Sequence, residues 1–166
     1  LVKSINKPLI LDADGLYPFN GKLYDLERRK HPLVITPHFG ELSRLIGFEK
    51  EIIISKFPEI LDNMQQNFSH TALIKQIPNC IVDKNRVIIN TTGNQGLATA
   101  GTGDVLSGLL SGLISQGYDP FSAACLGSYI HGKASDILTQ TKGFRGQIAS
   151  DLLEIIPKVI VSHEIS

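Results

Sequence analysis

The chain has 166 residues and no net charge, because 16 lysines and arginines balance 16 aspartates and glutamates. This balance argues against a protein that binds nucleic acid by neutralising phosphates, which needs a basic face. Hydrophobic residues make up 42% and charged residues 19%, a mixture typical of a globular protein and not of a disordered one. We therefore expect a single domain over residues 1–166 and no nucleic-acid partner.

Short apolar runs along the chain predict the strands. The first run ends in a polar turn that carries two carboxylates, and the last two runs face each other across a tight turn, as in a hairpin. The predicted strands cover residues 8–15, 32–38, 71–75, 80–82 and 86–89. Because the runs are continuously apolar, they favour a mainly parallel sheet with both faces covered.

Between and after these strands, apolar residues recur with the spacing of amphipathic helices. Pro58 interrupts the second helical segment and predicts a new helix start, and Pro120 opens a later helix after Asp119. The predicted helices cover residues 40–46, 49–67, 104–116, 120–140 and 147–161. Strands that alternate with helices indicate a layered α/β fold.

The sequence also predicts where the protein resides. No apolar run approaches the roughly 18 residues needed to span a bilayer, and the first seven residues lack the apolar core of a secretory signal. Cys80 and Cys125 have neither CxxC nor metal-ligand spacing, which favours two thiols in a reducing compartment. We expect a cytoplasmic protein without a membrane partner.

Glycine is concentrated in one stretch. Seven of the 15 glycines lie between residues 93 and 117, and glycine lets the backbone turn sharply or approach a ligand closely. Gly101, Thr102 and Gly103 lead directly into an apolar helix. The free N–H groups at such a helix start, with the positive end of the helix dipole, form an anion site.

Asp104 follows this loop, and its charge would repel a phosphate. One interpretation is a catalytic base that takes a proton from a hydroxyl attacking phosphorus. The other is a side-chain cap of its own helix, and the short pattern favours neither. Farther along, Gly108 and Gly112 form a small-residue face with nearby serines, which predicts close packing of this helix on the sheet.

Residues 94–108 carry a resemblance. They read NQGLATAGTGDVLSG, which resembles the signature of the ADP-dependent NAD(P)H-hydrate dehydratases, members of the ribokinase-like superfamily. Shorter matches occur in the right order, so the resemblance covers residues 9–157. These matches are LDAD at 11–14, TPHFGE at 36–41, Lys75, HGKASD at 131–136 and DLL at 151–153.

The resemblance implies a ribokinase-like fold of three α/β/α layers around a mainly parallel sheet. In that family the domain begins well before a segment like residues 9–14. The resemblance therefore implies that the N-terminal part of the fold is missing from this chain. Family members are commonly homo-oligomers, and in many bacterial relatives an NAD(P)H-hydrate epimerase domain precedes the dehydratase.

The implied activity is that of a metabolite-repair lyase. Family members dehydrate the S epimer of hydrated NADH or NADPH: ADP or ATP, with Mg²⁺, phosphorylates the 6-hydroxyl, and loss of phosphate regenerates the dinucleotide. Asp104 would activate the hydroxyl and contact the substrate, while the N–H groups of Gly101, Thr102 and Gly103 would stabilise charge on the phosphoryl group. Two alternatives are a kinase of a small alcohol, such as a vitamin precursor, and a nucleotide-binding module without catalysis.

Further site residues are implied by position. His38 would contact the substrate, and Glu41 would help to organise magnesium. The nucleotide would be bound by Lys75, Gln76, Ile77, Pro78, Asn79, Asn94, Gln95, Gly96 and Gly103. Simpler interpretations compete for three of these residues: a turn residue for His38, a first-turn glutamate favoured by the helix dipole for Glu41, and a solvated strand end for Lys75.

The remaining histidines are expected outside the chemistry. His131 lies within a matching motif on an apolar helix, which favours a structural role, and His31, His70 and His163 are expected at the surface. Two residues depart from the family pattern. Phe39 replaces a proline and Gln76 a glycine, which predicts altered substrate and nucleotide loops.

Overall fold

The centre of the protein is a five-stranded sheet, seen in a computed structural model that describes residue 2 and residues 4–164. Residues 1, 3, 165 and 166, at the ends of the predicted domain, lie outside the described residues. The strands are β1 (Leu9–Leu11), β2 (Leu33–Ile35), β3 (Thr71–Ile74), β4 (Asn79–Val82) and β5 (Val87–Asn90). They lie side by side in chain order.

The sheet is mixed. β1, β2 and β3 pair in parallel, whereas β3–β4 and β4–β5 are antiparallel. The prediction of a mainly parallel sheet was therefore wrong for its second half. The turn from β3 to β4 is too short for the crossover that parallel strands need. The predicted hairpin of β4 and β5 is confirmed.

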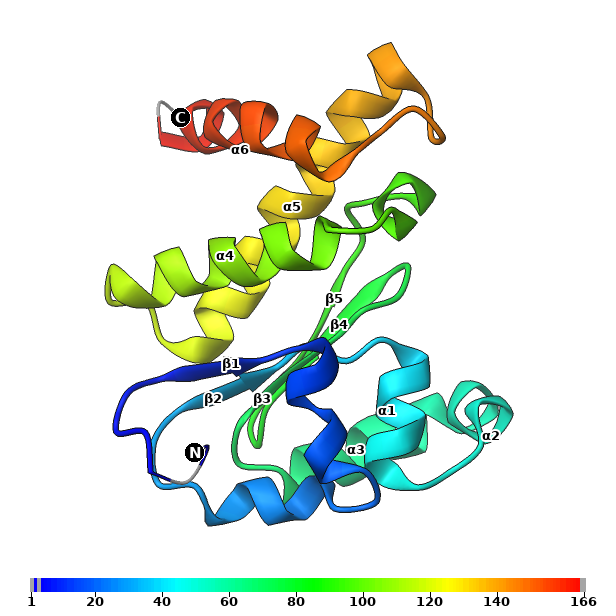
Figure 1. Cartoon of the computed structure of the whole chain (residues 1–166), viewed down its shortest axis with the longest axis vertical. Helices are drawn as coiled ribbons and strands as arrows, with labels where there is room; N and C mark the ends of the chain where they lie inside the picture. The colour runs from blue at the N-terminus through cyan, green and yellow to red at the C-terminus, as the bar shows by residue number, and fades with distance from the viewer. Residues whose placement is uncertain (1, 3, 165–166) are drawn as a thin grey trace.

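Helices cover both faces of the sheet (Figure 1). α1 (Phe39–Ile46), α2 (Lys50–Ser55) and α3 (Phe57–Asn67) lie on one side. On the other side are α4 (Thr102–Ser115), α5 (Pro120–Lys142) and α6 (Ala149–Glu164), of which α6 packs on α5. Each predicted helix is present, and the predicted break before Pro58 separates α2 from α3.

The two faces of the sheet account for the continuously apolar strands. In β2, Leu33 and Ile35 pack with the core under α1–α3, whereas Val34 packs with Leu106 and Leu110 of α4. Successive side chains of a strand point to opposite faces. Every position of β2 is therefore buried, as the sequence predicted.

Between β1 and β2 the chain follows an irregular path that the sequence did not predict. Three short 3₁₀ helices, η1 (Ala13–Gly15), η2 (Tyr17–Phe19) and η3 (Leu23–Arg28), make this connection, and a fourth, η4 (Gln95–Ala98), precedes α4. Three leucines in the connection, at positions 16, 23 and 26, are buried in the core under α1–α3. They hold the connection against the sheet without a regular helix.

Two predictions about packing were wrong. Gly108 and Gly112 are exposed, and no described atom outside α4 lies within 4 Å of a Cβ built at either. α4 instead turns its leucines toward the sheet, which leaves the glycine face outward. His70, expected at the surface, is 9% exposed, and its Nε2 lies 3.2 Å from the carbonyl oxygen of Leu26. No helix within the described residues is long and apolar enough to cross a membrane.

Ile35 and Ile88 provide a matched test of this core. Ile35 is completely buried, so we expect Ile35→Ala to lower the free energy of unfolding by about 2–5 kcal/mol through lost burial and a cavity. Ile88 is 45% exposed, and Ile88→Ala should change it by less than about 0.5 kcal/mol. Urea unfolding followed by circular dichroism measures both. Equal losses would contradict the placement of the core.

Candidate functional site

The carboxyl ends of β1, β2 and β3 meet the N-terminus of α4 at one edge of the sheet. Asp12 follows β1 and Lys75 follows β3, and the Lys75 Nζ lies 2.6 Å from Asp12 Oδ1. A Cβ built on Gly103 would lie 3.3 Å from Asp12 Oδ2, so the start of α4 lies against the same pair. Parallel strands thus bring together residues that are distant in the sequence.

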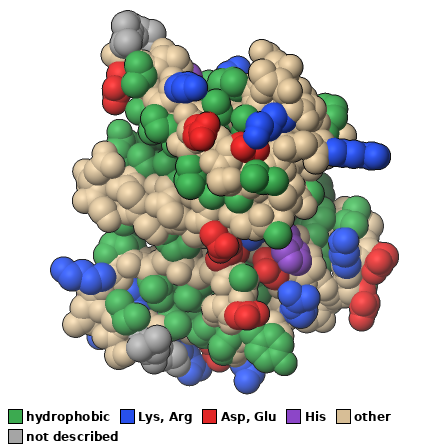
Figure 2. Space-filling model, turned by 45° about the horizontal axis from the view of Figure 1, so that its top comes forward, with side chains coloured by type: hydrophobic (Ala, Val, Ile, Leu, Met, Phe, Trp, Pro, Cys, Tyr) green, Lys and Arg blue, Asp and Glu red, His purple; other side chains and the backbone are tan. Residues whose placement is uncertain are grey.

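Lys75 is held in place by charge. Besides Asp12, the carboxylate of Glu41 lies 4.0 Å from its Nζ, and the side chain of Lys75 is only 23% exposed. Ser107 of α4 lies 3.4 Å from the second carboxylate oxygen of Asp12. The interpretation of Lys75 as a solvated strand end was therefore wrong. One ammonium and two carboxylates leave a formal net negative charge here. Figure 2 shows one face of the molecule, on which acidic and basic side chains and a histidine lie close together.

His38 and Glu41 form a capping box at the start of α1. The Nδ1 of His38 accepts hydrogen bonds from the N–H groups of Gly40 and Glu41, at 2.9 and 3.2 Å. The carboxylate of Glu41 accepts one from the N–H of His38, at 2.9 Å. Because Nδ1 is an acceptor, a neutral His38 carries its proton on Nε2. His38 thus lies in the turn before α1 and Glu41 in its first turn, as the simpler interpretations predicted. The side chain of His38 is 53% exposed at the site.

The glycine loop, residues 93–101, ends in a residue whose backbone has a left-handed conformation. Gly101 is the N-cap of α4 at a φ of 86°, a conformation that glycine adopts without steric cost. It supplies no side-chain cap, and neither does Asp104, which lies exposed in the first turn. The N–H of Thr102 donates to Thr99 at 3.3 Å, whereas those of Gly101, Gly103 and Asp104 have no acceptor among the described residues. These free donors suit an anion.

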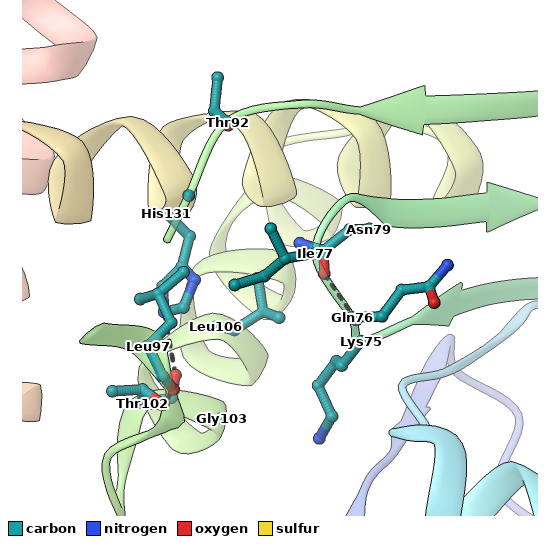
Figure 3. Close-up of a pocket in the computed structure, with 11 residues that line it drawn as sticks. Lys75, Gln76, Ile77, Asn79, Thr92, Leu97, Thr102, Gly103, Leu106 and His131 are labelled. Carbon is teal, nitrogen blue, oxygen red and sulfur yellow. Dashed lines mark hydrogen bonds between the residues drawn. The ribbon is translucent and has the colours of Figure 1, made fainter. Parts of the chain in front are cut away.

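A cavity of about 170 Å³ opens between this helix start and the turn after β3 (Figure 3). Lys75 lies on one side of it and His131 on the other. The lining residues are Lys75, Gln76, Ile77, Asn79, Thr92, Gly93, Leu97, Thr102, Gly103, Leu106 and His131.

Six of the predicted site residues line this cavity, namely Lys75, Gln76, Ile77, Asn79, Thr102 and Gly103. Other predicted residues lie outside its lining. Asn94 accepts a hydrogen bond from the N–H of Gly96 and donates one to Asp136, each at 2.9 Å. Gly96 packs closely against Gln147. Gln95 and Pro78 are exposed.

His131 is one of five lining residues that the sequence did not predict there. It is 4% exposed, and its Nε2 lies 3.0 Å from the carbonyl oxygen of Thr102. Burial lowers the pKa of His131 to about 4, so the neutral ring donates this hydrogen bond at neutral pH. The structural contact agrees with expectation, but its position in the cavity was missed. The signal was available, because His131 belongs to the HGKASD match.

A family model described as NAD(P)H-hydrate dehydratase matches residues 1–158. The chain belongs to this family. Among curated relatives, the Bifunctional NAD(P)H-hydrate repair enzyme Nnr of Moorella thermoacetica is 38% identical over 165 residues, or 99% of this chain and 31% of the relative. The ADP-dependent (S)-NAD(P)H-hydrate dehydratase of Neisseria meningitidis is 34% identical over 162 residues, 95% of this chain and 53% of that protein.

A solved structure shows the same architecture. The ADP/ATP-dependent NAD(P)H-hydrate dehydratase of Bacillus subtilis, co-crystallised with ATP and Mg²⁺ and soaked with CoA, superposes with a TM-score of 0.82 at 29% identity. The match covers 97% of this chain and 58% of that chain. The fold is ribokinase-like, as the resemblance implied. The chain therefore spans 31%, 53% and 58% of the lengths of these three proteins.

Burial of neutral His131 predicts a pH-dependent stability. The ordinary pKa of 6.5 applies to the unfolded chain and about 4 to the folded protein. Between these values only the unfolded chain binds the proton, so stability is lost as the pH falls from 6.5 to 4, by about 3 kcal/mol. His131→Asn should lack this part of the pH dependence, and His31→Asn should retain it. Chemical unfolding at a series of pH values measures both. Identical profiles for wild type and His131→Asn would contradict the assignment.

Proposed function

We propose that this protein is a metabolite-repair lyase that dehydrates the S epimer of hydrated NADH or NADPH at the expense of ADP or ATP. The observation that supports it most is the edge where paired Lys75 meets the free amides at the start of α4. The names of the Neisseria and Bacillus relatives state a nucleotide-dependent dehydratase. The chain spans 53% of the Neisseria protein, and the activity of the whole protein is part of the proposal.

The nucleotide would bind at the cavity. We place it against residues 75–79, the loop at 94–96 and Gly103, with its phosphates toward Lys75 and the start of α4. Sites that enclose a whole ligand measure roughly 300–1,000 Å³, and this cavity measures about 170 Å³. The cavity would therefore enclose only part of the nucleotide, and the rest would lie along the open edge.

The chemistry needs a base and an anion site. In the proposed reaction, Asp104 takes the proton of the 6-hydroxyl while the hydroxyl oxygen attacks the terminal phosphorus of the nucleotide. The bond between that phosphorus and the oxygen of the leaving nucleotide breaks. The free N–H groups of Gly101 and Gly103 stabilise the transferred charge, whereas the N–H of Thr102 donates to the carbonyl oxygen of Thr99. Phosphate then leaves C6, and a proton leaves C5, which restores the 5,6 double bond. His38, exposed at the same edge, would contact the substrate.

The residues present also fit Mg²⁺. Mg²⁺ is usually held by one or two carboxylates together with waters and substrate phosphates, and the carboxylates of Asp12 and Glu41 both lie beside Lys75. The described residues contain no cluster of three or more potential metal ligands, so phosphates and waters would complete the set. When bound, the ion would neutralise charge on the phosphates.

The setting of the enzyme is also proposed. Residues 1–166 would act as one domain in the cytoplasm, within a homo-oligomer, and an NAD(P)H-hydrate epimerase domain would be its fused partner. Size-exclusion chromatography with light scattering reports the oligomer directly.

Replacement of Asp104 tests the proposed base. Purified protein incubated with S-NADHX, Mg²⁺ and ADP or ATP should restore the absorbance of NADH. We expect Asp104→Asn to slow this by about 10²–10⁴-fold, because proton removal is lost, without loss of nucleotide affinity. Asp62→Asn, exposed on α3, is the control. Failure of wild type with both nucleotides, or a stable phosphorylated product, would contradict the proposed function.

Replacement of Glu41 tests the magnesium site. In Glu41→Gln the amide oxygen can still accept the N–H of His38, so the capping box survives while the charge is lost. We expect more Mg²⁺ to be needed for tight nucleotide binding, as measured by calorimetry across a Mg²⁺ titration. Glu51→Gln, in the first turn of α2 and exposed, should match wild type. An unchanged Mg²⁺ requirement in Glu41→Gln would exclude Glu41 as a ligand.

A further inference from the structure

One face of α5 contacts every segment that lines the cavity. Counted from the first member, the others follow after three, four, seven and eight residues, which places them on the same side of a helix. They are Ser128, His131, Gly132, Ser135 and Asp136. We call these five residues the α5 polar face. Except for Asp136, which is partly exposed, all are buried.

Ser128 connects this face to the hairpin. Its hydroxyl oxygen accepts hydrogen bonds from the amide groups of Asn79 and Asn90, at 3.1 and 2.8 Å. Asn79 in turn accepts the N–H of Gln76 at 3.0 Å, which fixes the turn after β3. Asn90 accepts the N–H of Thr92 at 3.3 Å. One hydroxyl therefore holds both ends of the hairpin at the cavity.

Gly132 and His131 form the middle of the face. A Cβ built on Gly132 would lie 2.4 Å from Thr92 Oγ1 and 2.6 Å from the Thr92 carbonyl, so only glycine lets this strand end lie on α5. One residue earlier, His131 donates to the carbonyl oxygen of Thr102. The middle of the face thus sets the distance between the strand end and the start of α4.

Asp136 holds the beginning of the glycine loop. Its two carboxylate oxygens accept hydrogen bonds from the N–H of Gly93, at 3.1 Å, and from the side-chain amide of Asn94, at 2.9 Å. Asn94 passes the constraint on by accepting the N–H of Gly96. One residue before Asp136, Ser135 donates to Gln147, whose side chain packs on Gly96. Both carboxylate oxygens of Asp136 are thus bonded to the glycine loop.

We propose that the α5 polar face is the positioning element of the nucleotide site, and that Asp136 is the residue that fixes its glycine loop. Asp136 does not line the cavity, so it acts through Gly93 and Asn94 as a positioning residue. The inference rests on the proposed nucleotide binding. Nucleotide affinity therefore depends on a carboxylate that the nucleotide does not touch.

The test compares Asp136→Asn with Asp151→Asn. In Asp136→Asn, the side-chain oxygen can still accept one hydrogen bond from the loop. The amide nitrogen replaces the second acceptor and cannot accept, so the loop loses one hydrogen bond. Asp151 is a matched control, because its carboxylate also accepts one backbone N–H, from Ile148, and one side-chain donor, Lys142, at the start of α6. Both variants should lower the unfolding midpoint, but only Asp136→Asn should alter the loop at the cavity.

ADP affinity, measured by calorimetry with Mg²⁺, gives the decisive readout. We expect Asp136→Asn to weaken ADP binding by about tenfold, the equivalent of one hydrogen bond to a charged group, and to speed exchange of the Gly93 amide. Asp151→Asn should bind ADP as wild type does. If Asp136→Asn binds ADP as tightly as wild type, the inference is wrong and the proposed function stands. If wild type binds neither ADP nor ATP, the proposed function fails, and the inference with it.

A second pair keeps the test decisive if Asp136→Asn does not fold. Ser128→Ala removes the oxygen shared by Asn79 and Asn90, whereas Ser111→Ala removes an exposed hydroxyl that, within the described part of the chain, bonds to the backbone of Ser107 alone. ADP binding should weaken several-fold in Ser128→Ala and remain unchanged in Ser111→Ala. Equal affinities in this pair would overturn the positioning role of the face.

Discussion

The structure depends on one constraint: three parallel strands end at the same edge of the sheet, where α4 begins. Asp12, His38 and Lys75 each follow one of these strands and are drawn together by the sheet itself. The ion pair between Lys75 and Asp12 then joins the first strand to the third and lies against Gly103. The free amides at the start of α4 face the same edge. The Lys75 ammonium with its carboxylate partners and these amides therefore surround one position, where an anion would bind.

A second layer of constraint comes from α5, which runs behind the cavity. On this helix, a buried hydroxyl bonds to the turn after β3 and the end of β5, a buried imidazole to the start of α4, and a partly exposed carboxylate to the glycine loop. Among described residues, no buried side-chain nitrogen or oxygen lacks a partner. A fully satisfied polar network of this kind fixes one geometry, because any shift would leave a buried group unpaired. Rigidity of the site thus originates one layer away from it.

Much of this could be predicted from sequence, because strands buried on both faces and helices with an apolar stripe leave local patterns. The hairpin and the break at Pro58 have local signals as well. The connection over residues 13–28 has none, since 3₁₀ turns lack a regular apolar period. Which face of α4 meets the sheet depends on its leucines, and the small-residue face of Gly108 and Gly112 was misassigned for that reason.

The candidate site, too, could be predicted from sequence only where the signal is local. The glycine loop and Lys75 are recognisable from residue type and order. The partner of Lys75 was not, since Asp12 lies 63 residues away and only strand pairing brings it near. Likewise, the contact between Asp136 and the N–H of Gly93 spans 43 residues. Pairings of this kind follow from tertiary structure, so local pattern does not contain them.

A nucleotide that binds with its phosphates at the start of α4 would protect the amides there from exchange with solvent. Hydrogen–deuterium exchange of the protein with and without ADP and Mg²⁺ tests this binding most directly. We expect slower exchange at residues 75–79 and 101–104, and no change at residues 29–33, at the opposite ends of the strands. Unchanged exchange at 101–104, with protection at the opposite end of the sheet, would contradict it.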